Sequence, residues 1–437
     1  MTRQLGEEVL VAYSKRFDTM RDEFLRAVDG FGLPFAPDVD DAAAQQDERV
    51  VKLASRGIVL QNDAKSAYHR WISLACLACR TGEHTESFIT SMQCPHNCFF
   101  CFNPNQPNYE YYKTHVNPLV DDLQRKHDEG AIYDCLAVTG GEPLLHLDET
   151  LAFLKLARSL YSHAHLRLYT SGHGFDESIA RRLVDAGLDE IRFSIKLEER
   201  PELLDAAYEA LETAVGLIDS VMVEMPVFPD QLEFMKGLLV HLDDLGVRGI
   251  NLLELGFPFH NANEFARRGY LLKPHPYRVL YGYWYGGGLP IAGSENVALE
   301  LLDFAVDREL SLGVHYCSLE NRLTSQVFRQ NSQAAACFPL RAFSQRDFFL
   351  KSAKVSGEAI DVVDKKLVEL GLHDQCDKLD GDAGFLELPL AIAARIAHDL
   401  PPIAWGISFA IAEEDGNYFA LKELRLDCVG SDEIPLD

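Results

Sequence analysis

The sequence has few basic residues and no long apolar run. Its 437 residues include 41 Lys and Arg against 67 Asp and Glu, which gives a formal charge of −26 at pH 7. A surface that binds a nucleic-acid backbone needs clustered Lys and Arg, so this charge argues against a nucleic-acid partner. No stretch approaches the roughly 20 apolar residues that cross a bilayer, which argues against a membrane protein.

A secretory signal is also missing, because the first ten residues, MTRQLGEEVL, lack a basic segment followed by an apolar one. We therefore expect a cytoplasmic protein. Ten cysteines in that reducing compartment are poor candidates for disulfides. Clustered cysteines are then expected to bind metal, and scattered ones to be buried as small apolar side chains.

The chain shows no internal repeat and divides into three predicted regions. Residues 1–75 form an N-terminal helical region, because apolar residues between Val9 and Val28 recur at helical spacing. Residues 76–337 form the core, where short β-rich runs alternate with helical segments. Residues 338–437 form a small α+β unit, in which Asp415-Gly416 is the turn of a hairpin.

The alternation in the core predicts an α/β fold with a parallel sheet, as an open sheet, a partial barrel or a full (β/α) barrel. The predicted strands are Ser87–Met92, Asp134–Val138, Leu166–Thr170, Glu190–Ile195, Ser220–Glu224 and Gly249–Leu253, with weaker candidates at Leu289–Ile291 and Gly313–Tyr316. The helices between them are Asp148–Tyr161, Glu177–Ala186, Leu203–Ile218 and Gln231–Leu245. Ligands in such folds bind at the carboxyl ends of the strands.

Three cysteines follow the first predicted strand at a Cys-x3-Cys-x2-Cys spacing: Cys94, Cys98 and Cys101. Each thiolate can bind one iron of a cubane cluster, which leaves the fourth iron open for a substrate or cofactor. A zinc alternative exists, because Cys76 and Cys79 together with Cys98 and Cys101 have the spacing of a structural site with four cysteine ligands. The cysteines alone leave both interpretations open.

A second motif follows the next strand. Gly140 and Gly141 allow the backbone to approach a ligand closely, and Pro143, after Glu142, sets the direction in which the chain leaves. This Gly-Gly-Glu-Pro turn comes one β-α unit after the cysteines, at the same predicted end of the sheet. The two motifs together favour one shared site.

These motifs resemble the radical S-adenosylmethionine (radical SAM) enzymes. The resemblance covers about residues 87–255 and rests on Cys94, Cys98, Phe100, Cys101, Gly140, Gly141, Glu142 and Pro143. It implies a [4Fe–4S] cluster on the three cysteines, with S-adenosylmethionine on the fourth iron. It also implies that the Gly-Gly-Glu-Pro backbone contacts the amino group of that cofactor and that Phe100 packs near its adenine.

Three residues at later strand ends are further candidates for the cofactor site. Ser194 could hydrogen-bond the ribose, Lys196 could pair with the methionyl carboxylate, and Glu224 could accept from a ribose hydroxyl. The alternative for each is a solvated residue at the rim of the sheet.

Four other cysteines predict an auxiliary metal site. Cys76, Cys79, Cys317 and Cys337 would hold a second [4Fe–4S] cluster, with His315 as a substitute ligand. The alternatives are zinc at the same residues, or buried free thiols.

The predicted function is reductive cleavage of S-adenosylmethionine to a 5′-deoxyadenosyl radical. That radical would take hydrogen from a peptide side chain or a small metabolite, and the electron would come from a reduced flavodoxin or ferredoxin. Two alternatives belong to other classes: a zinc-stabilised α/β binding protein without catalysis, and an electron-transfer iron–sulfur protein. The sequence identifies neither the subgroup, the substrate nor a catalytic side chain.

Overall fold

A computed structural model describes residues 4–38, 42–196, 201–282, 288–379 and 384–436. The chain forms two compact units. The barrel unit comprises Phe31–Pro276 and Tyr285–Arg322, and the sheet unit comprises Met1–Gly30, Tyr277–Trp284 and Leu323–Asp437. The N-terminal helix therefore belongs with the C-terminal residues, although the sequence analysis grouped it with residues 31–75.

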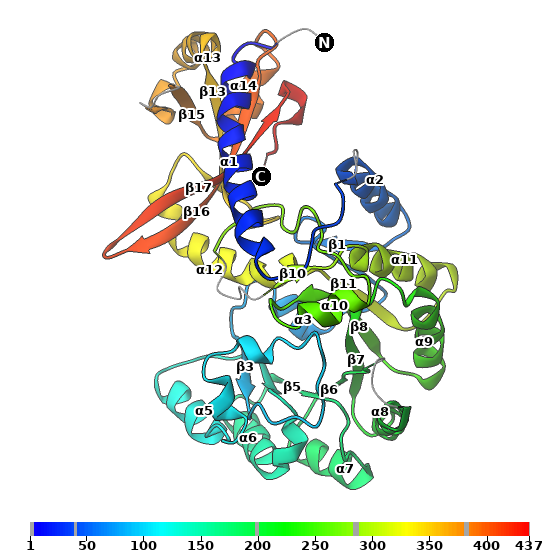
Figure 1. Ribbon diagram of the computed structural model, residues 1–437. Helices are drawn as coiled ribbons and strands as arrows, with labels where there is room; N and C mark the ends of the chain where they lie inside the picture. Colours follow the sequence, from blue (N-terminus) through cyan, green and yellow to red (C-terminus); the bar gives the residue numbers. More distant parts are fainter. Residues whose placement is uncertain (1–3, 39–41, 197–200, 283–287, 380–383, 437) are drawn as a thin grey trace. The chain divides into compact units, whose positions relative to one another are not determined.

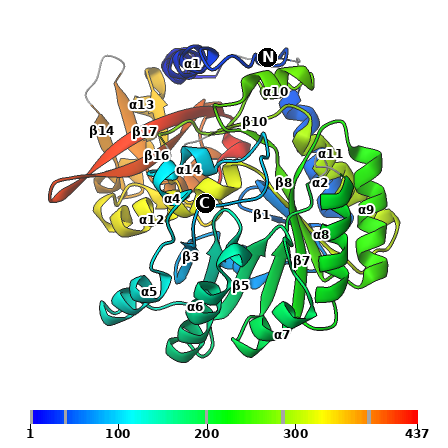
Figure 2. The same ribbon diagram turned by 60° about the horizontal axis from the view of Figure 1, so that its bottom comes forward.

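The barrel unit is built on a nine-stranded sheet in the order β1-β2-β11-β8-β7-β6-β5-β4-β3 (Figures 1 and 2). Seven strands are parallel: β3 (Thr85–Ile89), β4 (Cys135–Thr139), β5 (His165–Thr170), β6 (Glu190–Phe193), β7 (Ser220–Val227), β8 (Gly249–Glu254) and β11 (Gly313–Cys317). The antiparallel strands β2 (Ser66–His69) and β1 (Val59–Gln61) complete it. The described sheet is open, with edges at β1 and β3, so it corresponds to a partial barrel.

The predicted α/β class and its six consecutive parallel strands are confirmed, and so is the weaker strand at 313–316. The weaker strand at 289–291 proved wrong as part of this sheet, because β10 (Leu289–Pro290) pairs with β9 (Gly256–Phe257) in a separate ribbon. The sequence analysis also missed β1 and β2 within its helical region. Strands of three and four residues are too short to show an alternating pattern.

Helices cover the outer face of the parallel strands, as Figure 2 shows. They are α5 (Leu119–Asp128), α6 (Leu147–Leu160), α7 (Glu177–Asp185), α8 (Pro201–Ala214), α9 (Leu232–Leu245) and α11 (Ser294–Asp307). Local signals fix their ends. Asp176 caps α7 by accepting from the amide of Ile179 at 2.8 Å, and Gly246 ends α9 with a φ of 79°.

Alternate residues of each strand face opposite sides of the sheet. Apolar residues such as Leu168, Ile191 and Val223 belong to the hydrophobic core shared with the helices. The intervening positions are polar and buried, as at Arg192 and Asn251, which are 2% and 4% exposed. The inner face of the barrel unit is therefore lined with polar side chains.

The barrel unit has further helices besides these. They are α2 (Ala42–Ser55), α3 (Leu74–Ala78), η1 (Asn103–Asn105), α4 (Tyr109–Tyr112), η2 (Pro143–His146) and α10 (Ala262–Arg267). A further short helix, η3 (Glu320–Leu323), runs across the boundary between the two units. Trp71, just before α3, packs against Gly249 and Gly313, where an added Cβ would meet its side chain at 3.0 Å. The start of α3 thus lies at the amino ends of β8 and β11.

The sheet unit has an antiparallel sheet in the order β14-β15-β13-β16-β17. Its strands are β12 (Ala342–Phe343), β13 (Leu350–Ser356), β14 (Asp377–Leu379), β15 (Phe385–Leu388), β16 (Trp405–Asp415) and β17 (Tyr418–Val429). Its helices are α1 (Glu7–Asp29), α12 (Thr324–Ala334), η4 (Ala335–Cys337), α13 (Glu358–Glu369), η5 (His373–Gln375), α14 (Leu390–Ala397) and η6 (Ser431–Glu433). The predicted hairpin is present as β16 and β17, with Gly416 at a φ of 65° in the turn.

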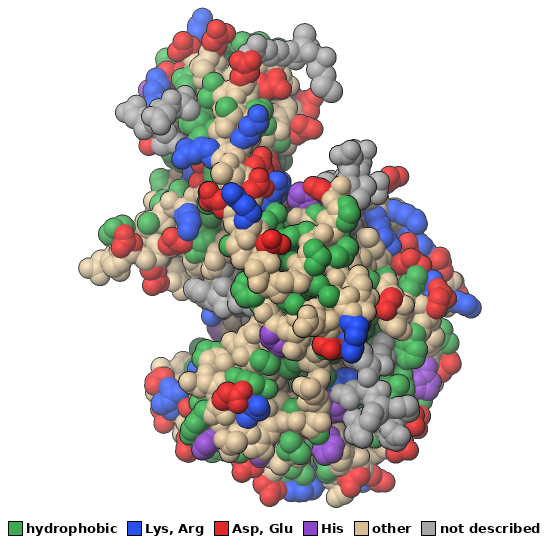
Figure 3. Space-filling model, viewed as in Figure 1, with side chains coloured by type: hydrophobic (Ala, Val, Ile, Leu, Met, Phe, Trp, Pro, Cys, Tyr) green, Lys and Arg blue, Asp and Glu red, His purple; other side chains and the backbone are tan. Residues whose placement is uncertain are grey.

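The first helix, α1, packs on this sheet. Leu10 is fully buried, and the hydroxyl of Tyr13 donates to Glu423 on β17 at 2.6 Å. The surface follows the acidic composition, since Asp and Glu side chains are spread over the face shown in Figure 3 with Lys and Arg among them. Of the described helices, none is long and apolar enough to span a bilayer.

Candidate functional site

The predicted cluster cysteines lie on the loop that leaves β3. Cys94 is exposed and Cys98 and Cys101 are half-buried, and the amide of Cys101 donates to the carbonyl of Cys98 at 3.1 Å. Burial raises the pKa of both Cys94 and Cys101, and the positive charge of Lys196 acts in the opposite direction on each. Lys196, which follows β6, therefore lies beside these two thiols.

The three sulfur atoms are not gathered as they would be around one ion. Among the described side chains, no group of three thiols from Cys76, Cys79, Cys94, Cys98 and Cys101 has its sulfur atoms all within 4.8 Å of one another. The structure thus does not assemble the four-cysteine zinc site that the sequence allowed. A cubane bonds each thiolate to a different iron, so its ligands stand further apart than those of one ion.

Polar side chains from other segments hold the cysteine loop. A ring nitrogen of His260 lies 2.9 Å from the carbonyl oxygen of Cys101, and Nδ2 of Asn261 donates to the carbonyl of Phe99 at 3.1 Å. Neither residue had a predicted role. Both residues lie in the segment after β9, which contains no motif that could have identified them from the sequence.

The Gly-Gly-Glu-Pro turn packs directly on the start of the cysteine loop. The amide of Gly141 donates to the carbonyl of Ser91, and that of Glu142 to the carbonyl of Gln93, each at 2.7 Å. A Cβ at Gly141 would lie 2.0 Å from the carbonyl oxygen of Gln93. Only glycine allows this approach, so the turn sets the position of the residues before Cys94.

Gly140 is constrained in the same way. Its φ is 134°, and an added Cβ would lie 2.3 Å from the carbonyl oxygen of Ser91. Its own carbonyl accepts from Nδ2 of Asn103 at 3.0 Å, which links the turn to the residue two places after Cys101. The cysteine loop is therefore fixed to the turn at both of its ends.

The Glu142 side chain joins two strand ends. It is 1% exposed and accepts from the hydroxyl of Thr170 and the amide of Ser171, each at 2.7 Å, and also from the Ser171 hydroxyl. Pro143, also buried, begins η2. The carboxylate thus ties the end of β4 to the end of β5.

Phe100 and Ser194 lie near this end of the sheet. The half-buried ring of Phe100 packs edge-on against Phe99 and Phe228, with ring centroids 5.2 and 5.6 Å apart. The amide of Ser194 donates to the carbonyl of Thr170 at 2.9 Å. Ser194 and Lys196 therefore follow β6 where Glu142 meets β5.

Glu224 is already engaged inside the barrel unit. Its Oε2 accepts from Nη1 of Arg192 and from Nδ2 of Asn251, both at 2.7 Å. Arg192 also pairs with Glu190, at 2.6 Å. Glu224 thus belongs to a buried charge network whose centre is Arg192. The sequence signal for this network was the spacing of Glu190 and Arg192, which stand two positions apart on one predicted strand.

This network reaches the predicted auxiliary site. Nη2 of Arg192 donates to Sγ of Cys76 on α3 at 3.4 Å, and Nδ2 of Asn251 lies 4.0 Å from the same sulfur. Burial raises the pKa of Cys76, while Arg192 acts in the opposite direction. The thiol of Cys76 therefore points into the barrel unit, towards the middle strands.

Cys317 ends β11, and Nδ2 of Asn321 donates to its sulfur at 3.3 Å. Burial raises the pKa of Cys317 to about 12, and the neighbouring thiols of Cys79 and Cys76 contribute to the rise. The structure thus brings Cys76, Cys79 and Cys317 near one another. Cys337, the fourth predicted ligand, belongs to the sheet unit and is exposed.

His315 faces the same interior. Its Nε2 lies 2.8 Å from the hydroxyl of Ser66, and burial lowers its pKa to about 3. Several buried polar atoms here have no hydrogen-bond partner among the described residues: Nδ1 of His315, Oδ1 of Asn251, and Nε and Nη1 of Arg167. Buried polar groups are rarely left unpaired, so this interior has the chemistry to hold a polar ligand or ordered water.

An open hollow lies at the opposite ends of the strands. It measures about 390 Å³, and its lining includes Trp71 and the first residues of three strands, His165, Glu190 and Ser220. The cysteine loop leaves the last residue of β3, at the carboxyl ends. Ligands of parallel sheets bind at the carboxyl ends, so we place the candidate site there.

The fold and the site thus define a class of protein. It is an α/β partial barrel with a three-cysteine loop and a glycine-rich turn at one end of the sheet. The family profile described as the radical SAM superfamily matches residues 88–233. The chain therefore contains a radical SAM domain. Enzymes with this domain use a [4Fe–4S] cluster and S-adenosylmethionine.

Two curated relatives share parts of the sequence. A Methanocaldococcus jannaschii protein, named as a candidate glycyl-radical enzyme activating enzyme, is 27% identical over 252 residues. The match covers 55% of this chain and 62% of that protein. The PqqA peptide cyclase of Granulibacter bethesdensis is 31% identical over 106 residues, 24% of this chain and 26% of the cyclase.

Solved structures show a looser similarity. The Streptococcus suis protein SuiB bound to S-adenosylmethionine matches at 13% identity and a TM-score of 0.40, covering 69% of this chain and 60% of SuiB. The protein anSMEcpe with bound AdoMet matches at 17% identity and a TM-score of 0.34, covering 40% of this chain and 52% of anSMEcpe.

Proposed function

We propose that this protein is a radical SAM enzyme that acts on a polypeptide. Cys94, Cys98 and Cys101 would hold the cluster, which together with S-adenosylmethionine would supply the radical chemistry that removes hydrogen from the substrate. One observation carries the proposal. The cysteine loop, the Gly-Gly-Glu-Pro turn and Lys196 meet at the carboxyl ends of β3, β4 and β6.

The residues present suit both cofactors. Three thiols on one loop leave a fourth iron without a protein ligand. Lys196 brings a positive charge to the side of Cys94 and Cys101, where it would pair with the carboxylate of S-adenosylmethionine. Phe100 would supply an apolar surface for the adenine, and Ser194 a hydroxyl for the ribose.

Glu224 is assigned a different role from the one expected. Its Oε2 accepts two hydrogen bonds from Arg192 and Asn251, so the side chain is held against β6 and β8. We propose that Glu224 contributes to the site by fixing these two neighbours. A contact with a ribose hydroxyl would use the acceptor capacity that remains.

The substrate class rests on the curated relatives. One is named as an activating enzyme for glycyl-radical enzymes, which are proteins, and the other as a cyclase of the PqqA peptide. The sequence left open a peptide or a small metabolite, and these two names favour the polypeptide. The matches span 62% and 26% of the two proteins, so the relation concerns the shared core.

We propose a second [4Fe–4S] cluster at Cys76, Cys79 and Cys317. The thiols of Cys79 and Cys76 are close enough to Cys317 to act on its pKa, and zinc at the same residues is the alternative. Arg192 at 3.4 Å from Cys76 would offset part of the negative charge that a buried thiolate cluster carries. Cys337, the fourth ligand that the sequence predicted, belongs to the other unit and is left out of this proposal.

The electron that starts each turnover must come from a low-potential donor, so a reduced flavodoxin or ferredoxin is the proposed partner. All ten cysteines are free, as the reducing cytoplasm requires of cluster ligands. We therefore propose a cytoplasmic location.

The test is formation of 5′-deoxyadenosine by protein purified without oxygen, reduced with dithionite and supplied with S-adenosylmethionine. Wild-type protein should form it, and Cys98→Ala should not. Cys428→Ala, which removes an exposed cysteine on β17, is the matched control and should keep the activity. Equal product from all three proteins would contradict the assignment.

The substrate class needs its own measurement. Deuterated polypeptides from the native organism, fractionated by size, are added to the reaction, and deuterium in 5′-deoxyadenosine is measured by mass spectrometry. Label from the polypeptide fraction is expected, because the abstracted hydrogen moves to the 5′ carbon. Label from the small-molecule fraction alone would show that the substrate is a metabolite.

A further inference from the structure

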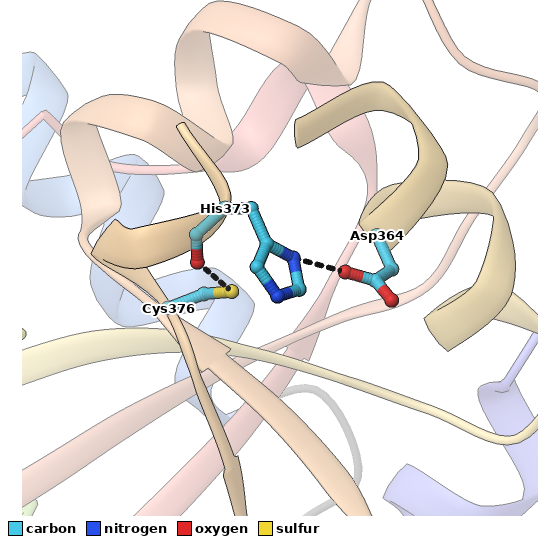
Figure 4. Close-up of side chains that lie close together, drawn as sticks. All are labelled: Asp364, His373 and Cys376. Carbon is cyan, nitrogen blue, oxygen red and sulfur yellow. Dashed lines mark hydrogen bonds and ion pairs between the residues drawn. The ribbon is translucent and has the colours of Figure 1, made fainter. Parts of the chain in front are cut away.

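A separate group of metal-ligand side chains lies in the sheet unit. Asp364 comes from α13, and His373 and Cys376 come from η5 and the residue after it (Figure 4). A carboxylate oxygen, an imidazole nitrogen and Sγ all lie within 4.8 Å of one another. Within the described part of the chain, this is the one group of three His, Cys, Asp or Glu residues that converges so closely.

Hydrogen bonds hold the three side chains together. Nδ1 of His373 lies 2.7 Å from Oδ1 of Asp364, and Sγ of Cys376 donates to the carbonyl of His373 at 2.9 Å. In a 3-10 turn, side chains three residues apart lie on the same side, which brings His373 and Cys376 together. The convergence is therefore built into the local backbone and needs no large rearrangement.

The surrounding charges favour a cation. Burial raises the pKa of the Cys376 thiol, and the nearby carboxylates of Asp364, Asp377 and Asp374 raise it further. One positive group opposes this field, because Nζ of Lys378 pairs with Oδ2 of Asp364 at 2.8 Å. Oδ1 of Asp364 remains on the side of His373.

We propose that Asp364, His373 and Cys376 bind one divalent cation of the Zn²⁺ type. One oxygen, one nitrogen and one sulfur ligand suit Zn²⁺, with water in the fourth tetrahedral position. The side chain of His373 is 49% exposed, so both the ion and that water have access.

The proton balance follows from the ligand chemistry. Cys376 binds as the thiolate and releases its proton to solvent. His373 stays neutral, because its ring proton moves to the nitrogen that does not bind the ion. With one thiolate and one carboxylate, the ion and its ligands together are formally neutral.

The experiment uses the full chain with its iron sites loaded, treated with a mild chelator and then titrated with Zn²⁺ against a chromophoric chelator. Wild-type protein should bind one zinc per chain, and Cys376→Ser and His373→Gln should bind it at least about tenfold more weakly. Cys428→Ser, which removes a cysteine of the same unit outside the group, should bind zinc like the wild type.

Lys378→Met supplies a test of opposite sign. It removes the ammonium that competes for Asp364, so zinc should bind more tightly, which a general loss of folding cannot produce. Co²⁺ gives a spectroscopic readout, because a thiolate ligand adds a charge-transfer band that Cys376→Ser should remove. Equal zinc affinity in all variants, or a Co²⁺ band that survives in Cys376→Ser, would overturn the proposal.

Discussion

Nη2 of Arg192 lies 3.4 Å from Sγ of Cys76, so a buried guanidinium on β6 meets a thiol of α3 inside the barrel unit. The same guanidinium pairs with Glu190 at 2.6 Å and Glu224 at 2.7 Å. One side chain therefore balances a fully buried carboxylate, Glu190, and a half-buried one, Glu224, and faces a proposed cluster ligand. Three predictions concern this interior, and a fourth concerns the Gly-Gly-Glu-Pro turn.

Arg192→Leu should destabilise the protein strongly. The substitution leaves Glu190 and Glu224 without their shared cation, and removing one partner of a buried ion pair costs about 3–5 kcal/mol. The free energy of unfolding is measured by urea titration. Arg182→Leu is the control, because its pair with Asp148 is exposed and contributes about 0–1 kcal/mol. An equal loss of unfolding free energy in both variants would show that the ion pairs of Arg192 stabilise the protein no more than an exposed pair does.

Acid should remove the contribution of Glu190. Burial opposes its ionisation, but Arg192 and His165 together lower its pKa from 4.5 to about 2. A lowered carboxyl pKa stabilises the fold above the unfolded pKa, and that stability is lost as pH falls from about 4.5 towards 2. Glu190→Gln should be about 3 kcal/mol less stable at neutral pH, with the difference shrinking across this window. A difference independent of pH would contradict the ion pair.

Cys76→Ser combined with Cys79→Ser should separate the two proposed clusters. Wild-type protein purified without oxygen should hold about eight iron and the double variant about four, because a cubane contains about four. The double variant should still cleave S-adenosylmethionine yet fail to convert its substrate. Iron, sulfide and zinc analysis decides the matter. If the double variant holds as much iron as the wild type, Cys76 and Cys79 bind no cluster and only pack against their neighbours. Zinc in place of iron in the wild type would identify a zinc site.

Gly141→Ala should disturb the cysteine loop. The added methyl group would lie 2.0 Å from the carbonyl oxygen of Gln93, which must move together with the start of the loop. We expect iron content and 5′-deoxyadenosine formation to fall at least about tenfold, a loss of about 1.4 kcal/mol in the corresponding equilibrium. Gly237→Ala on α9 is the control, because a Cβ there meets nothing within 4 Å and alanine favours a helix. Unchanged iron in Gly141→Ala would show that the turn does not position the loop.

Sequence patterns predicted the parts of this protein whose cause is local. Cys94, Cys98 and Cys101 are close in sequence, and so are the two glycines at 140 and 141, so both motifs could be recognised in the sequence. The structure gives the reason for the glycines, because a side chain has no room at either position. The parallel strands were predicted because each is a short apolar run between helical segments. Their α/β class is confirmed by the nine-stranded sheet.

Tertiary structure decided the contacts that join distant residues. Arg192 and Cys76 are 116 positions apart, and His260 is 159 positions from the Cys101 carbonyl it contacts. Such pairs produce no periodic pattern or fixed spacing in the sequence. The desolvation cost of the two polar groups, and the interaction that offsets it, arise only once both residues are buried together. The strands β1 and β2 are a similar case, because they form by pairing, β2 with β11 and β1 with β2, rather than by local propensity. The chain by itself thus determined which chemistry is present at the cysteine loop, and folding determined which charges surround it.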